Sequence, residues 1–226
     1  MIRTPVILTG ALSLFAGVAL AQVPSESLSE AQCGTLKNAY GPFDYRTSKT
    51  QLEVVENFHF TPDVEQLRRG QSSYVGSDID YTLRASPNHH RALVSLTNLA
   101  LRTNSPKPSG TGYTVDCYFQ RALRFANDDG LVRIIYGVYL YRTGKKREAL
   151  RMLEDARRFE NDNPNLHYNL GLVYFDLRDM PRALESAQTA YRLGAQLPGL
   201  KNKLKAAGVW DPGADPKPGE EREKSK

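Results

Sequence analysis

Three histidines and two aspartates in the N-terminal half are the residues whose types could support metal or acid–base chemistry. They are His59, Asp78, Asp80, His89 and His90. Adjacent helical residues point about 100° apart, so His89 and His90 cannot easily share one ion. His90 falls where burial is ordinary, and His89 is expected to be exposed or hydrogen-bonded to the segment before it. Asp78, or Ser77 before it, is better explained as a helix N-cap. We therefore predict no metal site and no cofactor.

Catalytic sequence motifs are not found in this chain. It has no H-E-x-x-H, no G-x-S-x-G, no phosphate-binding glycine loop and no G-x-G-x-x-G. We therefore predict a binding protein that is not an enzyme. The Tyr, His and Asp content of residues 33–86 is compatible with sugar contacts, which leaves one alternative: an envelope enzyme or a glycan-binding accessory protein. A pocket in which Asp78, Asp80 and His89 converge would favour that alternative.

The two cysteines, Cys33 and Cys117, carry information about both compartment and topology. An even number of cysteines in an exported chain indicates a disulfide first. Two buried thiols or a metal site are the competing interpretations, although neither cysteine has a Cys or His partner at zinc-ligand spacing. We predict a Cys33–Cys117 disulfide that ties the N-terminal segment across the back of the first helix pair.

Residues 1–21 have the pattern of a secretory signal peptide. Arg3 is their only charge, and the apolar stretch ends Ala19-Leu20-Ala21 before Gln22. An uncleaved membrane anchor of this length is marginal. We therefore predict a periplasmic or secreted protein with no stable membrane insertion after cleavage. The formal net charge is +5, or +4 without Arg3, which is too weak to indicate a nucleic-acid partner.

A separation of 34 residues recurs in the second half of the chain and predicts the elements that position everything else. The pairs are Gly137 and Gly171, Ala149 and Ala183, and Ala156 and Ala190. Helices are expected over 131–141, 147–159, 166–177 and 181–193, with turns between them. Glycine allows the two helices of a pair to approach closely, and alanine leaves room for the next helix.

This register resembles the tetratricopeptide repeat (TPR) family, whose 34-residue unit carries a large residue, Leu, Gly, Tyr, Ala, an aromatic residue and Ala at fixed offsets. In the last unit those positions hold His167, Leu170, Gly171, Tyr174, Ala183, Ala187 and Ala190. In the unit before they hold Arg133, Tyr136, Gly137, Leu140, Ala149, Leu153 and Ala156. The match is incomplete, because Arg133 and His167 replace the usual Trp. Residues 41–46, 58–62 and 78–93 resemble an uncharacterised group of secreted bacterial TPR proteins, which supplies no activity.

The resemblance implies an all-α fold, a short TPR-type helical solenoid of about three helix pairs. Its predicted parts are a signal peptide (1–21), an N-terminal cap segment (22–86), repeats (87–129, 130–163 and 164–197), a C-terminal capping helix (198–210) and a disordered tail (211–226). The first repeat is lengthened by a Pro/Gly/Ser loop at 104–112. The cap segment is expected to hold a helix pair at 62–69 and 77–85, or an extended strand at 57–60. Caps are needed because a solenoid exposes apolar ends.

The resemblance also implies a concave groove lined by the first helix of each repeat. Its predicted residues are Arg91, Asn98, Ile134, Val138, Tyr141, Arg142, Asn165, Tyr168, Asn169, Leu172 and Phe175. Only Asn169 matches the chaperone-type carboxylate clamp of some TPR proteins. An apolar centre with Asn and Arg at its edges suits a peptide with hydrophobic anchors, so we expect a protein or peptide of the cell envelope as partner. The alternative is that a capping helix of the chain fills this groove.

Overall fold

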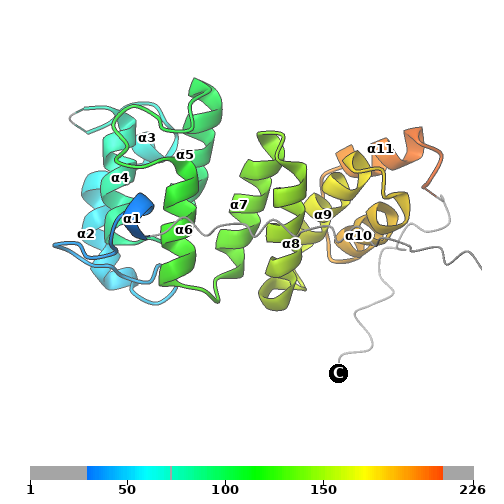
Figure 1. Ribbon diagram of the computed structural model, residues 1–226, viewed down its shortest axis with the longest axis horizontal. Helices are drawn as coiled ribbons and strands as arrows, with labels where there is room; N and C mark the ends of the chain where they lie inside the picture. The colour runs from blue at the N-terminus through cyan, green and yellow to red at the C-terminus, as the bar shows by residue number, and fades with distance from the viewer. Residues whose placement is uncertain (1–29, 72, 211–226) are drawn as a thin grey trace, which may run out of the picture.

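The computed structural model describes residues 30–71 and 73–210, and this part of the chain is all-helical, without strands. The predicted signal peptide and the predicted disordered tail lie outside the described residues. Figure 1 shows an elongated array that runs from α2 and α4 at one end to α11 at the other. The helices are α1 (Glu30–Cys33), α2 (Lys49–His59), α3 (Pro62–Glu65), α4 (Val75–Ala85), α5 (His90–Thr103), α6 (Val115–Phe125), α7 (Gly130–Arg142), α8 (Lys146–Glu160), α9 (Pro164–Asp176), α10 (Met180–Arg192) and α11 (Gly199–Ala206).

Six of these helices form the three expected pairs, so the prediction of an all-α helical array is confirmed. The pairs are α5 with α6, α7 with α8, and α9 with α10, and α8 also packs on α9. Side chains of Asp129, Asn163 and Asp179 each accept a hydrogen bond from a backbone N–H in the first turn of the helix that follows. These caps satisfy donors that a helix start leaves unpaired, and so they fix where α7, α9 and α10 begin.

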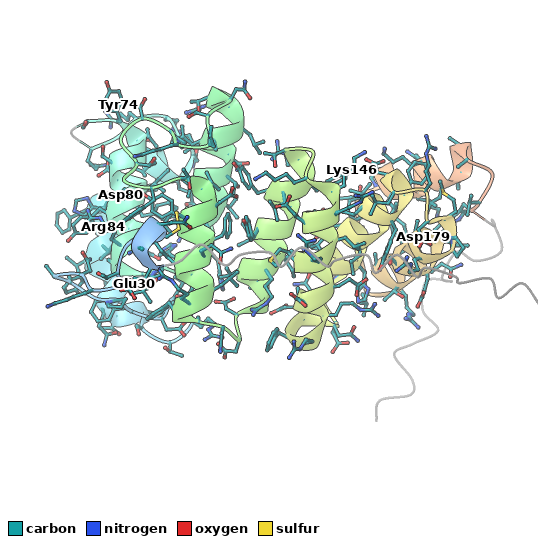
Figure 2. The ribbon with its side chains drawn as sticks, viewed as in Figure 1. Glu30, Tyr74, Asp80, Arg84, Lys146 and Asp179 are labelled. Atoms are coloured by element: carbon teal, nitrogen blue, oxygen red, sulfur yellow. A yellow bond between two sulfur atoms is a disulfide. The ribbon has the colours of Figure 1, made fainter. Side chains whose placement is uncertain are left out.

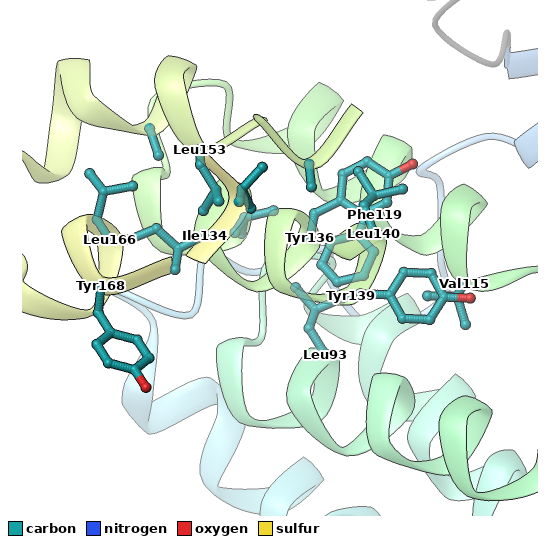
Figure 3. Close-up of a cluster of buried hydrophobic side chains, with 14 of the residues drawn as sticks. Leu93, Val115, Phe119, Ile134, Tyr136, Tyr139, Leu140, Leu153, Leu166 and Tyr168 are labelled. Atoms are coloured by element: carbon teal, nitrogen blue, oxygen red, sulfur yellow. The ribbon is translucent and has the colours of Figure 1, made fainter. Parts of the chain in front are cut away.

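Small residues set the spacing within each pair. Ala149, Leu153 and Ala156 of α8 are fully buried. A Cβ atom at Gly137 would lie 2.7 Å from Cγ of Leu153, so only glycine allows α7 to approach α8 this closely. Aromatic packing joins the first pair to the second, where the Phe119 ring stacks on Tyr136 with centroids 4.5 Å apart (Figure 3). The buried side chains of the repeats form one continuous core.

The N-terminal segment is helical, and several of its details differ from the sequence prediction. Residues 57–60 are not extended, because α2 continues to His59. The helix expected over 62–69 stops at Glu65, since Leu67 adopts a left-handed conformation with φ of 57°. Neither Ser77 nor Asp78 is an N-cap, because α4 begins earlier, at Val75. The N-terminal segment therefore forms an α2–α4 pair, and α4 packs against α5 as α6 packs against α7.

The predicted Pro/Gly/Ser loop is packed against α4. Gly76 of α4 lies so close to the loop that a Cβ atom there would be 2.2 Å from the carbonyl oxygen of Ser109. The Gly112 N–H donates to Asp80 Oδ1 at 3.1 Å and to the Tyr118 hydroxyl at 3.1 Å. The insertion therefore joins α4 to the start of α6 and contributes to the terminal packing.

The predicted disulfide between Cys33 and Cys117 is confirmed, and it joins α1 to α6 (Figure 2). Their Cα atoms are 5.0 Å apart, within the range that an unstrained backbone allows. The buried Arg121 guanidinium donates to the carbonyl oxygens of Cys33 at 3.0 Å and Thr35 at 2.6 Å. Arg124 donates to the Gly34 carbonyl oxygen at 2.8 Å. Residues 33–35 are thus held on α6 both covalently and by two arginines.

The C-terminal end is closed by α11, as the sequence predicted. Leu200 and Leu204 are fully buried, and a Cβ atom at Gly171 would lie 2.4 Å from Leu200 Cδ2. Trp210 packs edge-on against Tyr191 of α10, with ring centroids 5.7 Å apart. Within residues 30–71 and 73–210, none of the helices combines the length and the apolar character that crossing a membrane requires.

Candidate functional site

The predicted groove residues of α5 contact the chain's own N-terminal segment. Arg91 donates to both carboxylate oxygens of Glu65, at 2.8 Å and 2.5 Å, and this hydrogen bonding lowers the pKa of Glu65. The Ser95 hydroxyl donates to the Glu65 carbonyl oxygen at 2.9 Å, and Arg102 donates to the Leu67 carbonyl oxygen at 2.9 Å. Residues 65–67 therefore lie along this face of α5. The part of the groove that Arg91 was predicted to line is filled by the protein itself.

The middle of the groove, on α7, remains apolar and half-exposed. Ile134 is buried, whereas Val138 and Tyr141 are half-buried and Arg142 is exposed. Arg142 donates to Asn98 Oδ1 at 3.3 Å, which joins α7 to α5 across the groove. The structure thus brings the predicted residues Asn98 and Arg142 together across the groove.

The groove face of α9 combines apolar side chains with a carboxylate. Leu172 and Phe175 are half-buried, and Tyr168 is buried. Asp176 accepts from the Tyr141 hydroxyl at 2.9 Å, which joins α7 to α9. Burial and this hydrogen bond raise the pKa of Tyr141 to about 12, so its hydroxyl is a stable donor at neutral pH.

Helix α11 borders this face without covering all of it. The Lys203 ammonium lies 5.2 Å from the centroid of the Phe175 ring and 3.7 Å from Asp176 Oδ1. A Cβ atom at Gly199 would meet the Tyr168 hydroxyl at 2.9 Å. On the first turn of α9, Asn165 is exposed, and its carbonyl oxygen accepts a hydrogen bond from the Asn169 side chain at 2.7 Å. The end cap therefore covers Tyr168 and borders Phe175.

What stays accessible is a short apolar face on α7 and α9. Its half-exposed side chains are Leu131, Ile135, Val138, Leu172 and Phe175. Polar groups edge this apolar face, with Arg142 and Asn98 toward α5 and Asp176 and Lys203 toward α11. Leu131 and Ile135, which stand at groove positions on the first helix of their repeat, complete the face.

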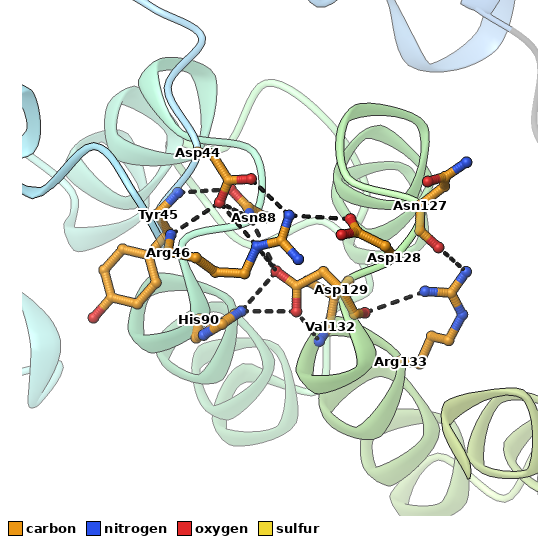
Figure 4. Close-up of polar contacts among 10 residues, drawn as sticks. All are labelled: Asp44, Tyr45, Arg46, Asn88, His90, Asn127, Asp128, Asp129, Val132 and Arg133. Atoms are coloured by element: carbon orange, nitrogen blue, oxygen red, sulfur yellow. Dashed lines mark hydrogen bonds and ion pairs between the residues drawn. The ribbon is translucent and has the colours of Figure 1, made fainter. Parts of the chain in front are cut away.

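A buried polar network joins the N-terminal segment to the first two repeats (Figure 4). Asn88 donates through Nδ2 to Asp44 Oδ1 at 2.9 Å and to Asp129 Oδ2 at 2.9 Å. Asp129 also accepts from His90 Nε2 at 2.8 Å and from the Val132 N–H at 3.3 Å. Burial raises the pKa of Asp129, but hydrogen bonding and charge from His90 outweigh it, so the pKa is lowered. Each of these side chains is paired within the protein, so we assign the network to folding.

Asp78, Asp80 and His89 do not converge on one pocket, although His59 Nδ1 lies 3.1 Å from Asp78 Oδ1. Asp80 contacts the Arg84 guanidinium at 2.8 Å and the Tyr118 hydroxyl. His89 is fully buried, where its Nδ1 accepts from the Ala92 N–H and its Nε2 lies 3.0 Å from Glu56 Oε1. Burial and the charge of Arg91 lower the pKa of His89 to about 3. In the described part of the chain, His, Cys, Asp and Glu form no group of three placed to hold a metal ion.

Comparison with known proteins does not assign this arrangement to a family. No protein-family model matches the chain, and no curated protein matches it either. The functional argument therefore rests on two features of the fold, which are the partly buried apolar face of α7 and α9 and a pocket on α2.

Proposed function

We propose that this protein is a TPR-family scaffold of the periplasm or extracellular space that binds a partner protein or peptide. The binding surface is the apolar face of α7 and α9. One observation carries this proposal: five apolar side chains stay half-exposed on first-helix positions of two consecutive repeats, although neighbouring parts of the same face are covered. An apolar patch rimmed by polar groups is typical of an interaction site.

The family assignment is supported by the repeat register together with the helix pairs it predicted. Gly137 and Gly171 occupy the close-approach positions, with a Cβ atom 2.7 Å or less from Leu153 or Leu200 side-chain atoms. The compartment is supported by the disulfide, because such bonds persist in oxidising surroundings. Binding is favoured over catalysis because the candidate acid–base residues Asp80 and His89 are engaged in separate internal contacts.

The covered ends of the groove define what kind of ligand fits. Arg91 is occupied by Glu65 and Tyr168 by α11, so the accessible face spans two helices only. A short helix or extended segment can place one or two apolar side chains between Val138 and Phe175. The exposed Arg142 at one edge favours a segment with an acidic residue beside the anchors, whereas Asp176 is already paired with Lys146 and Lys203.

The test is a double substitution on this face, Tyr141→Ala with Phe175→Ala. The mature chain, residues 22–226, is immobilised and exposed to an envelope extract, and captured proteins are quantified. We expect the partner to be lost by about tenfold or more, because aromatic anchors dominate such interfaces. The matched control is Phe159→Ala, an aromatic residue that is 43% exposed on α8 outside the groove positions.

The helical circular dichroism signal must stay unchanged in both variants for the comparison to hold. A partner that the folded double variant captures as well as the wild type, while Phe159→Ala loses it, would place the interface on α8. Equal capture by all three proteins would show that the α7–α9 face is not used for that partner.

A further inference from the structure

A second exposed feature lies at the opposite end of the array, on the outer side of α2 and α4. It is a pocket of about 300 Å³ lined by Tyr40, Val54, Val55, Phe58, His59 and Tyr81. Val54 and Phe58 occupy successive turns of α2 and are 46% and 65% exposed. In Figure 1, α2 stands at the end of the array, and no other helix among residues 30–71 and 73–210 covers its outer side.

One polar group in this apolar pocket is held in a defined orientation. The His59 ring stacks on Tyr81 with centroids 3.8 Å apart, and its Nδ1 lies 3.1 Å from Asp78 Oδ1. Asp78 is only 6% exposed, and its second oxygen accepts from the Gln71 N–H at 2.9 Å. A carboxylate accepts hydrogen bonds, so Nδ1 is the donor, and in the neutral imidazole Nε2 keeps its lone pair for another group.

This orientation indicates a ligand that is partly polar. An apolar side chain that docks into the pocket would form no hydrogen bond with His59, so the orientation that Asp78 gives this ring would not strengthen its binding. A ligand hydroxyl would gain, because a preoriented acceptor forms its hydrogen bond without a further loss of side-chain freedom. Pockets that bind small polar molecules combine apolar walls with a few placed polar groups in this way.

We propose that this pocket binds a pyranose ring of an oligosaccharide. A pyranose has an apolar face of C–H groups and an edge of hydroxyls. The Tyr40 and Phe58 rings supply apolar walls for the face, and His59 Nε2 accepts a hydrogen bond from one hydroxyl. Glycoside hydrolysis needs a pair of carboxyl groups across the bond, and the lining residues include none, so the role is binding. This proposal is independent of the partner groove on α7 and α9.

In the experiment, the intact purified protein is titrated separately with chitotetraose, cellotetraose and maltotetraose, and isothermal titration calorimetry measures the binding. We expect saturable binding of at least one of them, with a dissociation constant near 1 mM or below, as a single small pocket supports. Phe58→Ala should weaken this binding by about tenfold, because it removes one wall of the pocket. Tyr74→Ala is the control, since Tyr74 is also 65% exposed but lies outside the pocket lining.

A second variant separates a sugar from an apolar ligand. His59→Phe keeps an aromatic ring beside Tyr81 but removes the acceptor, so oligosaccharide binding should fall by about tenfold or more. The proposal is overturned if none of the three oligosaccharides binds saturably, or if Tyr74→Ala weakens binding as much as Phe58→Ala. It is also overturned if N-acetyltryptophanamide binds more tightly than the sugars and His59→Phe does not weaken that binding. In that case the occupant is an apolar side chain of a protein partner.

Discussion

The two halves of the array are held together by different kinds of contact. Residues 30–71 and 73–129 are cross-linked by the Cys33–Cys117 disulfide, by arginines on backbone carbonyls and by the Asn88 network. In residues 130–210 the repeats pack through small and apolar side chains, and side chains such as Asn163 and Asp179 cap their own helices. Both halves are helical, so the difference lies in how the helices are fixed relative to one another.

The contrast follows from the regularity of the sequence. Where the repeat length stays at 34 residues, each helix pair presents the same alanines and glycines to the next. Packing then sets the register, and side-chain hydrogen bonds such as Tyr141 to Asp176 add to it. The long loop before α6 and the irregular α2–α4 pair break that register. In this half, hydrogen bonds and the disulfide fix the relative positions of the helices. The Gly112 N–H donates to Asp80, and Arg121 donates to the Cys33 carbonyl oxygen.

The largest expected effect comes from removing the disulfide with Cys33→Ala and Cys117→Ala. The two residues are 84 positions apart, and closing a loop of that length stabilises the fold by about 4.5 kcal/mol in the chain-entropy treatment. We expect a loss of this order in urea unfolding at pH 7. Hydrogen exchange should speed up in α1 to α6 while α9 and α10 keep their protection. Equal loss of protection in α9 would contradict the contrast between the halves.

The next effect is expected from Asp129→Asn, at about 3 kcal/mol, because the change leaves donors of Asn88 and His90 without a charged acceptor in a buried site. Asp128→Asn is a matched control. The Asp128 side chain is 60% exposed and pairs with Arg46, so its loss should cost under about 1 kcal/mol. Urea unfolding of both variants at pH 7 measures the difference. Equal destabilisation by the two substitutions would contradict the claim that the buried network stabilises the N-terminal half.

The same carboxyl group predicts a pH dependence. The pKa of Asp129 is lower in the folded protein than in the unfolded chain. The unfolded chain therefore takes up this proton first, at pH values near 4. The stabilisation is present above the unfolded pKa and is lost as the pH falls through the folded pKa. Wild-type unfolding free energy should drop more steeply below pH 4 than that of Asp129→Asn, and parallel curves would contradict the assignment.

The smallest effect is expected in the regular half, from Gly137→Ala at about 1–2 kcal/mol. Alanine favours a helix, but its Cβ atom would lie 2.7 Å from Leu153 Cγ, and Leu153 is fully buried. Combining it with Leu153→Ala should give a loss smaller than the sum of the two single losses, since the second change makes room. Thermal unfolding of the three variants measures this coupling. Additive losses would show that the glycine is not required for close approach.

Much of the regular half could be predicted from the sequence because its information is local. The spacing of Gly137, Ala149 and Ala156 within one helix pair specifies which faces meet, and the next pair repeats it. The disulfide was predictable for a simpler reason, because only two cysteines are present. Leu131 and Ile135 stand at first-helix positions of the same register, so their place on the groove face follows from their spacing.

The tertiary structure decided what the N-terminal segment covers and what it exposes. Glu65 lies 26 residues before the Arg91 that it binds, and Asp44 lies 44 before Asn88, across loops whose paths no periodicity specifies. Likewise His59 reaches Asp78 only because α2 and α4 are antiparallel. A repeat pattern encodes contacts between neighbouring helices, since every unit faces the same surroundings. Contacts across irregular loops depend on the folded path of the chain, and those contacts set both the length of the groove and the position of the pocket.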